Sequence, residues 1–236
     1  MTTHTPPMRQ VYDTVEQTDT EAAAWLATAI KDSVASRGQC AMAVSGGHSP
    51  WPMFATLAER DDIPWDHITL FQVDERIAPE GDDARNYTHL KANLLSQRPE
   101  LSAQMHAMPV NDPDLDAACF RYAHLLMEAC GDPPVLDIVH LGLGPDGHTA
   151  SLVPGDGVLQ VTDCDVSMTV GTYQDRRRMT LTYPCINRAK RIMWQVVGGD
   201  KADALAKMMA GDRSVPGGAI ATEQAVVFAD AAAVNG

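Results

Sequence analysis

The chain has 236 residues, 45% of them hydrophobic, which is enough for one domain with its own core, and we expect a single domain over residues 1–236. Its net charge of -13 disfavours nucleic acid and anionic membranes as partners, because both bind basic surfaces. No apolar run reaches the roughly 20 residues that a bilayer requires, and residues 1–10 lack the features of a signal peptide. Five scattered cysteines without a CxxC pair argue against a disulfide framework or a zinc site and favour a reducing cytoplasm.

Helix-like and strand-like segments alternate along the first half of the chain. Residues 20–36 are expected to form a helix that ends at Gly38, and residues 40–44, "CAMAV", a short apolar strand. A second helix is expected from Ser49 or Pro50 to Arg60, because proline is tolerated in a first helical turn. We then expect a strand over residues 67–76, followed by helices in "NYTHLKANLL" and "DPDLDAACFRYAHLLMEACG".

The second half continues the alternation. Residues 135–143, "VLDIVHLGL", have apolar side chains on both faces, which is typical of a strand buried in a parallel sheet. The "TASL" that follows at 149–152 is able to start a helix. Strands are expected over residues 178–184, in "RIMWQVVGG" and over residues 225–230, with a helix in "DKADALAKMMAG". This order predicts an α/β fold in which a mostly parallel sheet is flanked by helices.

Ligands of such sheets bind at the carboxyl ends of the strands, and four expected strands end in polar loops. The glycines of "SGGHSP" offer free backbone N–H groups before a helix, an arrangement that binds phosphate or carboxylate, although such a motif taken alone is more often a plain tight turn. Adjacent charges after a buried strand need partners, either in a surface ion pair or in a site. The four loops are Ser45–Gly47, Asp74–Arg76, Gly144–His148 and Gly198–Lys201.

The glycine turn that begins at Gly142 fits the GxGxxG pattern of dinucleotide-binding proteins, but we reject that interpretation. Pro145 removes an amide donor from the turn, and Asp146 would bring negative charge near a pyrophosphate. What remains is a turn that exposes Asp146 and His148. A lone histidine is usually structural, whereas one beside an aspartate at a strand's carboxyl end is a candidate general base.

The few cations of this acidic chain gather in one stretch. They form either a solvated basic face or, in part, a site for an anionic substrate. The stretch contains Arg176, Arg177, Arg178, Arg188, Lys190, Arg191 and Lys201.

Four blocks of the sequence together resemble the 6-phosphogluconolactonase family. They are "AVSGGHSP", "VDERIAP…RNY", "LGLGPDGHTASLVPG" and "RMTLTYPCINRAKRIMWQVVGGDKADAL", and they span nearly the whole chain in the order and spacing of that family. The resemblance implies a modified Rossmann-type sheet like that of glucosamine-6-phosphate deaminase and ribose-5-phosphate isomerase. It also implies hydrolysis of 6-phospho-D-glucono-1,5-lactone to 6-phosphogluconate, the second step of the oxidative pentose phosphate pathway, with no metal or organic cofactor.

Carried over by position, the resemblance makes His148 the catalytic base and Asp146 its neighbour, with Asp74 as a further catalytic candidate. The remaining matches are implied to bind the sugar and its phosphate: Ser45, Gly46, Gly47, Arg76, Asn86, Gly144, Arg178 and Lys201.

The sequence departs from the family pattern in four places. His48 stands where a small hydroxyl residue is usual, and Arg85 precedes the matching Asn86 in place of serine. Val153 replaces a phenylalanine, a change that we expect to affect packing alone. The triple arginine 176–178 leaves the choice of phosphate ligand open by one position.

A δ-lactone is an activated ester, so water is a sufficient nucleophile once a base takes its proton, and a neutral imidazole suits that task near pH 7. We expect His148 to activate the water and then protonate the ring oxygen. Backbone amides of a glycine turn, or Arg76, would stabilise the oxyanion, and Asp146 or Asp74 would orient the histidine or the sugar hydroxyls. The chain has no GxSxG motif, which argues against a serine acyl-enzyme.

Three alternatives remain. A sugar-phosphate deaminase or isomerase on the same scaffold is disfavoured because no glutamate follows His148 in "TASLVPG". A non-catalytic phosphosugar-binding regulator would need a DNA-binding segment, and a purely structural protein gives no reason for Asp146 and His148. The expected partner is a phosphorylated sugar lactone, and the chain is expected to be a cytoplasmic monomer or homodimer.

Overall fold

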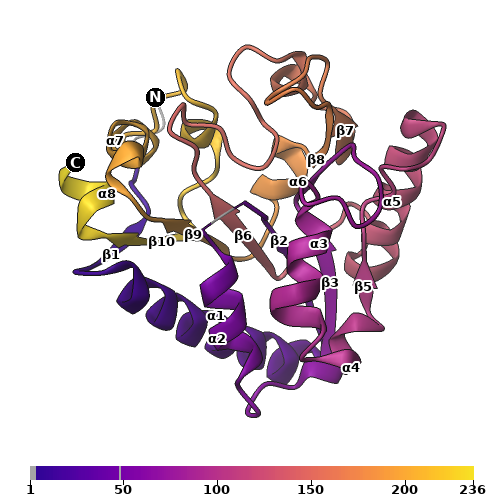
Figure 1. Ribbon diagram of the computed structural model, residues 1–236, viewed down its shortest axis with the longest axis horizontal. Coiled ribbons are helices and arrows are strands. Elements are labelled where there is room, and N and C mark those ends of the chain that lie inside the picture. The colour runs from indigo at the N-terminus through magenta and orange to yellow at the C-terminus, as the bar shows by residue number, and fades with distance from the viewer. Residues whose placement is uncertain (1–3, 48) are drawn as a thin grey trace.

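Seven parallel strands form the central sheet of the computed structural model, which describes residues 4–47 and 49–236 (Figure 1). Because neighbouring strands run parallel, the chain must cross over a face of the sheet between one strand and the next. In spatial order the strands are β1 (Met8–Tyr12), β10 (Ala225–Asp230), β9 (Ile192–Val196), β6 (Ile138–Gly142), β2 (Cys40–Val44), β3 (Ile68–Gln72) and β5 (Met105–His106).

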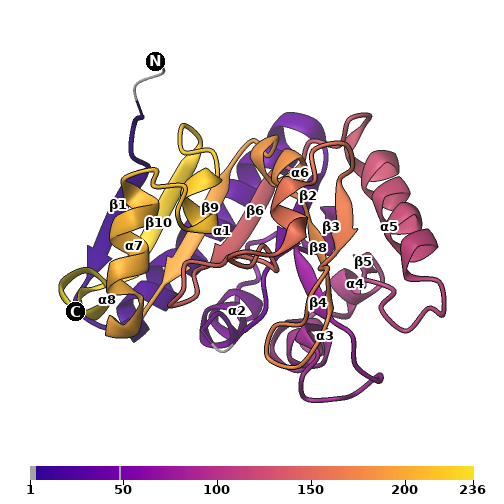
Figure 2. The same ribbon diagram turned by 90° about the horizontal axis from the view of Figure 1, so that it is seen from above.

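Helices cover both faces of this sheet (Figure 1; Figure 2). The layer on one face contains α1 (Val15–Arg37), α2 (Trp51–Ala58), α3 (Asn86–Leu90) with the π-helical turn Lys91–Leu95, and α4 (Pro99–Ser102). The layer on the other face contains α5 (Leu115–Cys130), α6 (Tyr183–Asn187), α7 (Ala202–Met209) and α8 (Ala231–Asn235). In the part of the chain that the structure describes, none of these helices has the length and hydropathy needed to cross a bilayer.

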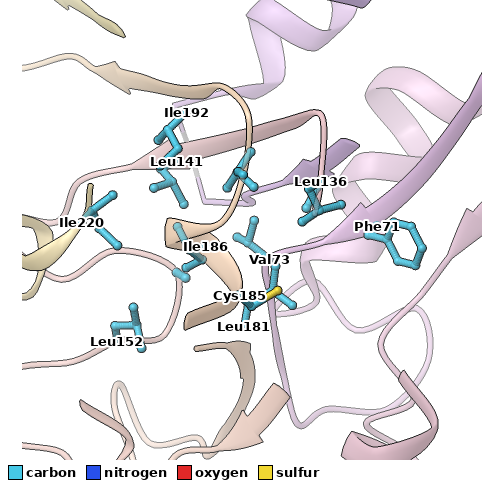
Figure 3. Close-up of a cluster of buried hydrophobic side chains, with 14 of the residues drawn as sticks. Phe71, Val73, Leu136, Leu141, Leu152, Leu181, Cys185, Ile186, Ile192 and Ile220 are labelled. Carbon is cyan, nitrogen blue, oxygen red and sulfur yellow. The ribbon is translucent and has the colours of Figure 1, made fainter. Parts of the chain in front are cut away.

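The inner strands of the sheet are buried on both faces, as their apolar composition predicts, whereas the edge strand β1 is mostly exposed. Met42 and Met193 pack in the cluster under α1 and α2, whereas their neighbours Ala43 and Trp194 pack in the opposite cluster. Figure 3 shows part of that second cluster, to which Leu152 contributes from a loop. The α/β class and the parallel sheet flanked by helices are therefore confirmed.

The strand expected over residues 67–76 is wrong as a single element. β3 ends at Gln72, and residues Asp74–Arg76 form β4 in a second, antiparallel sheet with β8 (Arg178–Leu181) and β7 (Val166–Met168). Val73 makes the transition, since its N–H donates to the carbonyl of Val44 at 3.0 Å and its carbonyl accepts from the N–H of Leu181 at 2.7 Å. This small sheet, which the sequence did not predict, places Arg76 directly opposite Arg178.

The "TASL" segment does not start a helix. Ala150 has a φ of 50°, outside the right-handed helical region, and Thr149 pairs with Leu152 in an isolated bridge. The Ser151 hydroxyl donates to Oδ2 of Asp74 at 2.6 Å, and its N–H donates to Oγ1 of Thr180 at 3.1 Å. Contacts with the small sheet, distant in sequence, therefore override the local helical preference.

Other boundaries follow local rules that the sequence analysis applied only in part. α1 begins earlier than expected because Thr14 caps it, accepting from the N–H of Gln17. The expected strand 178–184 ends at Leu181, and α6 begins at Tyr183 with proline in its first turn. The short elements β1, β5, β7 and α8 were not predicted.

A buried carboxyl group lies where α1 packs against β9. Asp19 is 5% exposed and accepts a hydrogen bond from Nε2 of Gln195. Burial raises the pKa of Asp19 to about 6, although the hydrogen bond from Gln195 lowers it in part. In the unfolded chain the same group titrates near pH 4. Folding therefore retains a proton on Asp19 that the unfolded chain releases between about pH 4 and pH 6, so its contribution to stability is lost as pH rises through this interval.

Asp19→Asn removes this titration while keeping an oxygen that accepts from Gln195. Between pH 4 and pH 7 the wild type should lose the stability that protonated Asp19 contributes, whereas the variant should not. The change in free energy of unfolding over this interval should therefore be about 1–3 kcal/mol more favourable in the variant, since one pKa unit corresponds to about 1.4 kcal/mol. Urea unfolding of both proteins at the two pH values measures this difference, and an unchanged difference would show that Asp19 ionises as freely in the fold as in the unfolded chain.

Candidate active site

One cavity of about 260 Å³ lies at the carboxyl ends of β2, β6 and β9 and gathers nearly every residue that the sequence predicted for the site. Asp146 is the exception; it lies against His148. The predicted residues that line the cavity are Ser45, Gly46, Gly47, Asp74, Arg76, Asn86, Gly144, His148, Arg178 and Lys201.

The loop after β2 forms one wall of this cavity. The Ser45 hydroxyl donates to the carbonyl of His140 at 3.0 Å, which ties the loop to β6. A Cβ on Gly46 would lie 2.0 Å from Oδ1 of Asn86, so only glycine fits there. The amides of Gly46 and Gly47 have no acceptor among the described residues and remain available to an anion. His48 lies outside the described residues.

The turn after β6 carries the base candidate. The carbonyl of His148 accepts from the N–H of Gly144 at 2.8 Å, and Nδ1 of His148 lies 2.6 Å from Oδ1 of Asp146. Because a carboxylate only accepts, Nδ1 carries the hydrogen and Nε2 keeps its lone pair. Burial alone would raise the pKa of Asp146, but its hydrogen bonds with the side chain and the backbone N–H of His148, and its attraction to that imidazole when protonated, lower it to about 2. The turn therefore holds an ionised carboxylate behind an imidazole that is able to accept a proton.

Gly144 is required by the imidazole itself. A Cβ at this position would lie 2.0 Å from Nδ1 of His148 and 2.8 Å from Oδ1 of Asp146. Gly142, which also lines the cavity, differs, since a Cβ there would have no atom within 4 Å. The two glycines thus offer a matched pair.

The charges of the "DER" block find partners inside the protein. Oδ2 of Asp74 accepts from Ser151, and Oδ1 accepts from Nδ2 of Asn86 at 3.2 Å. The fully buried Glu75 accepts from the N–H groups of Asn86 and Tyr87 at 2.8 and 2.9 Å. Arg85, unexplained by the sequence, pairs with Glu75 at 3.2 Å. Asp74 is thus a rigid wall of the cavity with both oxygens engaged.

Three cationic side chains line the cavity with His148. Arg178 is 2% exposed, and its Nη2 donates to Oε1 of Gln174 at 2.9 Å. The Nε atoms of Arg178 and Arg76 are buried and have no acceptor in the described part of the chain. Nζ of Lys201 lies 2.7 Å from Oδ2 of Asp200. Unused donors on buried arginines are suited to an anionic ligand, because buried polar groups require hydrogen-bond partners.

The other basic residues of the expected cluster lie elsewhere. Arg177 donates to the carbonyl of Thr169, and Arg176 lies 3.6 Å from Asp82 beside an adjoining cavity. The strand register of β8 therefore brings Arg178 into the cavity, and not Arg177. Arg188, Lys190 and Arg191 pair with Asp165, Asp137 and Asp32 respectively.

Five polar residues that line the cavity were not among the predicted site residues. One of them, Ser49, lies within the expected "SGGHSP" loop. His140 interrupts the apolar strand segment 135–143, a signal that was visible, and Gln195 follows the same pattern in β9. Tyr173 and Gln174 come from the loop between β7 and β8, where no periodicity marks them. In the described residues, no group of three or more His, Cys, Asp or Glu side chains is placed to hold a metal ion.

Residues 13–228 match the family described as glucosamine-6-phosphate isomerases/6-phosphogluconolactonase. The chain belongs to this family. A curated relative from Synechocystis sp., named 6-phosphogluconolactonase, is 37% identical over 187 residues, which cover 78% of this chain and 77% of the relative.

Solved structures show the same fold. The crystal structure of a 6-phosphogluconolactonase from Shewanella baltica superposes with a TM-score of 0.84 and 25% identity over 95% of this chain and 98% of that one. A monomeric glucosamine-6-phosphate deaminase superposes with a TM-score of 0.80 and 21% identity over 96% and 98% of the two chains. The fold alone therefore accommodates both chemistries.

The two glycines of the base turn should respond differently to alanine. Gly144→Ala should lower the free energy of unfolding by about 1–3 kcal/mol, because the new methyl overlaps the imidazole, and Gly142→Ala should change it by at most about 0.5 kcal/mol. Urea unfolding measures the stabilities, and long-range ¹H–¹⁵N spectra report whether His148 keeps its hydrogen on Nδ1. Equal effects of the two substitutions would contradict the close packing at Gly144.

Proposed function

We propose that this protein hydrolyses 6-phospho-D-glucono-1,5-lactone to 6-phosphogluconate. The observation that carries the proposal is the His148–Asp146 pair, joined at 2.6 Å, in the same cavity as Arg178 and Lys201. One end of the substrate needs a base to activate water, and the other needs cations for its phosphate. The curated relatives named 6-phosphogluconolactonase support this reading.

In the first step, Nε2 of His148 takes a proton from water, and the water oxygen forms a bond to C1 while the C1 carbonyl electrons move onto its oxygen. When the carbonyl re-forms, the bond between C1 and the ring oxygen breaks, and the imidazolium returns its proton to that oxygen. The carboxylic acid product ionises and releases one proton to the solvent. Asp146 stays ionised throughout and stabilises the imidazolium.

The phosphate is held by Arg178, Lys201 and the amides of Gly46 and Gly47. Among the described residues, Nε of Arg178 and the amides of Gly46 and Gly47 have no acceptor, so they can form new hydrogen bonds without breaking old ones. Arg76, with its free Nε, stabilises the oxyanion at C1 or shapes the sugar pocket. Asp74 and Asn86, already locked to one another, fix the position of the sugar hydroxyls.

A sugar-phosphate deaminase is the second candidate on this scaffold. It would need a further carboxylate to assist ring opening. Among the described residues that line the cavity, Asp74 is the one carboxylate, and Ser151 and Asn86 occupy both of its oxygens. Proton release from freshly made lactone, against ammonia release from glucosamine 6-phosphate, separates the two activities.

We further place the protein in the cytoplasm as a monomer or homodimer. The five cysteines, all within the described residues, are free, which suits a reducing compartment.

His148→Ala should lower kcat for the lactone by about 10²–10⁴ with little change in KM, because a general base acts in the transition state. Proton release followed by a pH indicator, with spontaneous hydrolysis subtracted, gives both constants. His124→Ala is the matched control, since His124 is exposed and pairs with Glu128 on the surface of α5. A folded His148→Ala variant with a rate near that of the control would exclude His148 as the base.

The value of kcat/KM for unphosphorylated gluconolactone should be about 10²–10⁴-fold lower than that for the phosphorylated lactone, since hydrogen bonds to charged groups contribute about 1.5–3 kcal/mol each. Arg178→Ala and Lys201→Ala should each remove part of this preference, and Arg177→Ala, outside the cavity, should leave it intact. Steady-state kinetics on both lactones test this. Equal turnover of the two substrates by the wild type would show that no phosphate site operates.

A further inference from the structure

We propose that Tyr173 is a positioning residue that couples the phosphate-binding arginine to the catalytic base. One aromatic side chain contacts both His148 and Arg178, and it lines the cavity between them. The inference rests on the proposed lactonase function. It holds that binding of the substrate phosphate raises the rate of hydrolysis as well as the affinity for the substrate.

The loop between β7 and β8 holds Tyr173 in place. Its N–H donates to the carbonyl of Arg176 at 3.0 Å, closing a turn in which Gln174 and Asp175 have φ angles of 51° and 63°. At the start of the loop, the N–H groups of Val170 and Gly171 donate to Asp156 at 3.0 and 2.9 Å. The loop is therefore fixed at both ends, with the tyrosine ring directed at the cavity.

On one side the ring meets the base. The Tyr173 hydroxyl oxygen lies 3.3 Å from Nδ1 of His148, and the two ring centroids are 4.9 Å apart. Since Nδ1 donates its hydrogen to Asp146, Nδ1 has no lone pair for the phenol, and the phenol oxygen lies beside that N–H as a second, weaker acceptor. Burial raises the pKa of Tyr173, and the Asp146 charge raises it further, so the phenol keeps its proton. The Nδ1–H group of the imidazole thus faces both the Asp146 carboxylate and the phenol oxygen.

On the other side the ring supports Arg178. The guanidinium carbon lies 4.9 Å from the tyrosine ring centroid, a cation–π distance. Nη2 of Arg178 lies 3.3 Å from the Tyr173 carbonyl, to which it donates. Buried Arg178 therefore has its position set by Tyr173 as well as by β8, while its Nε stays unpartnered among the described residues.

A phosphate bound to Arg178 restrains the guanidinium, the guanidinium restrains the ring, and the ring restrains the imidazole. A substrate that carries the phosphate is thus expected to raise kcat as well as to lower KM, because binding away from C1 orders the base. The charged and titratable groups around His148 are Asp146 and Tyr173 in contact, with Asp74, Arg76, His140, Arg178 and Lys201 elsewhere in the cavity lining.

Two substitutions separate the hydroxyl from the ring. Tyr173→Phe keeps the ring under Arg178 and removes the hydroxyl, so kcat should fall about 3–10-fold on both lactones while the phosphate preference persists. The acid limb of the pH profile should move to lower pH, because the imidazolium loses one acceptor of its Nδ1 hydrogen. Tyr173→Leu removes both contacts and should also reduce the preference in kcat by about 10-fold, within the usual range of a buried cation–π contact.

The control variant is Thr172→Ala, because Thr172 is exposed and precedes Tyr173 in the same loop. It should match the wild type in both constants and in the pH profile. If Tyr173→Leu keeps the wild-type preference in kcat, or if Tyr173→Phe leaves the acid limb unmoved, the coupling is refuted.

A readout without turnover distinguishes this proposal from the proposed function. Inorganic phosphate titrated into the wild type should shift the imidazole NMR signals of His148, assigned by their absence in His148→Ala, and in Tyr173→Leu the shift should disappear although phosphate still binds. A shift that survives in Tyr173→Leu overturns the coupling whatever the enzyme hydrolyses. A wild type that turns over neither lactone overturns the lactonase proposal, while the phosphate response still tests Tyr173.

Discussion

Two backbone hydrogen bonds of Val73 hold the large and small sheets in their relative position. Its N–H bonds to β2 and its carbonyl to β8, so the chain leaves the parallel sheet and enters the antiparallel one within a single residue. Asp74 and Arg76 follow at once in β4, and their places in the cavity depend on this transition. Without it, Arg76 would not lie opposite Arg178, and Ser151 would have no carboxylate to bind.

The small sheet also resolves the electrostatic problem of the site. An acidic chain that binds a phosphorylated sugar must concentrate positive charge locally, and buried arginines are costly unless their donors are satisfied. The buried carboxylate of Glu75 stabilises this region by accepting four hydrogen bonds, one from the side chain of Gln72 and three from backbone N–H groups in β4 and α3. On the cavity side, the Nε donors of Arg76 and Arg178 have no acceptor among the described residues, which leaves them available to an anionic ligand.

The proposed base and the proposed phosphate ligands come from different parts of the fold. The turn after β6 forms the His148–Asp146 pair from neighbouring residues, whereas Arg178 arrives on β8 and Lys201 precedes α7. Tyr173 is the side chain that contacts both the base and Arg178, and it comes from a loop that belongs to neither. Since the scaffold also occurs in a deaminase, the contents of this cavity carry the functional distinction.

Features of the fold and the site that depend on residues adjacent in the chain were predictable from the sequence. Apolar runs with helical segments between them specified the parallel sheet, and Asp146 and His148 were recognisable because one glycine turn holds both. The resemblance of four blocks pointed to the family that the comparisons show. Tertiary structure decided the rest. The local pattern of "TASL" permits a helix, but Ser151 binds Asp74, 77 positions away in the sequence. Three consecutive arginines look equivalent until the register of β8 turns Arg178 inward, and nothing local to Tyr173 indicates that it lies between the base and a cation. Local propensity is fixed by adjacent residues, whereas register and loop placement are fixed by contacts that exist only after the two sheets have packed.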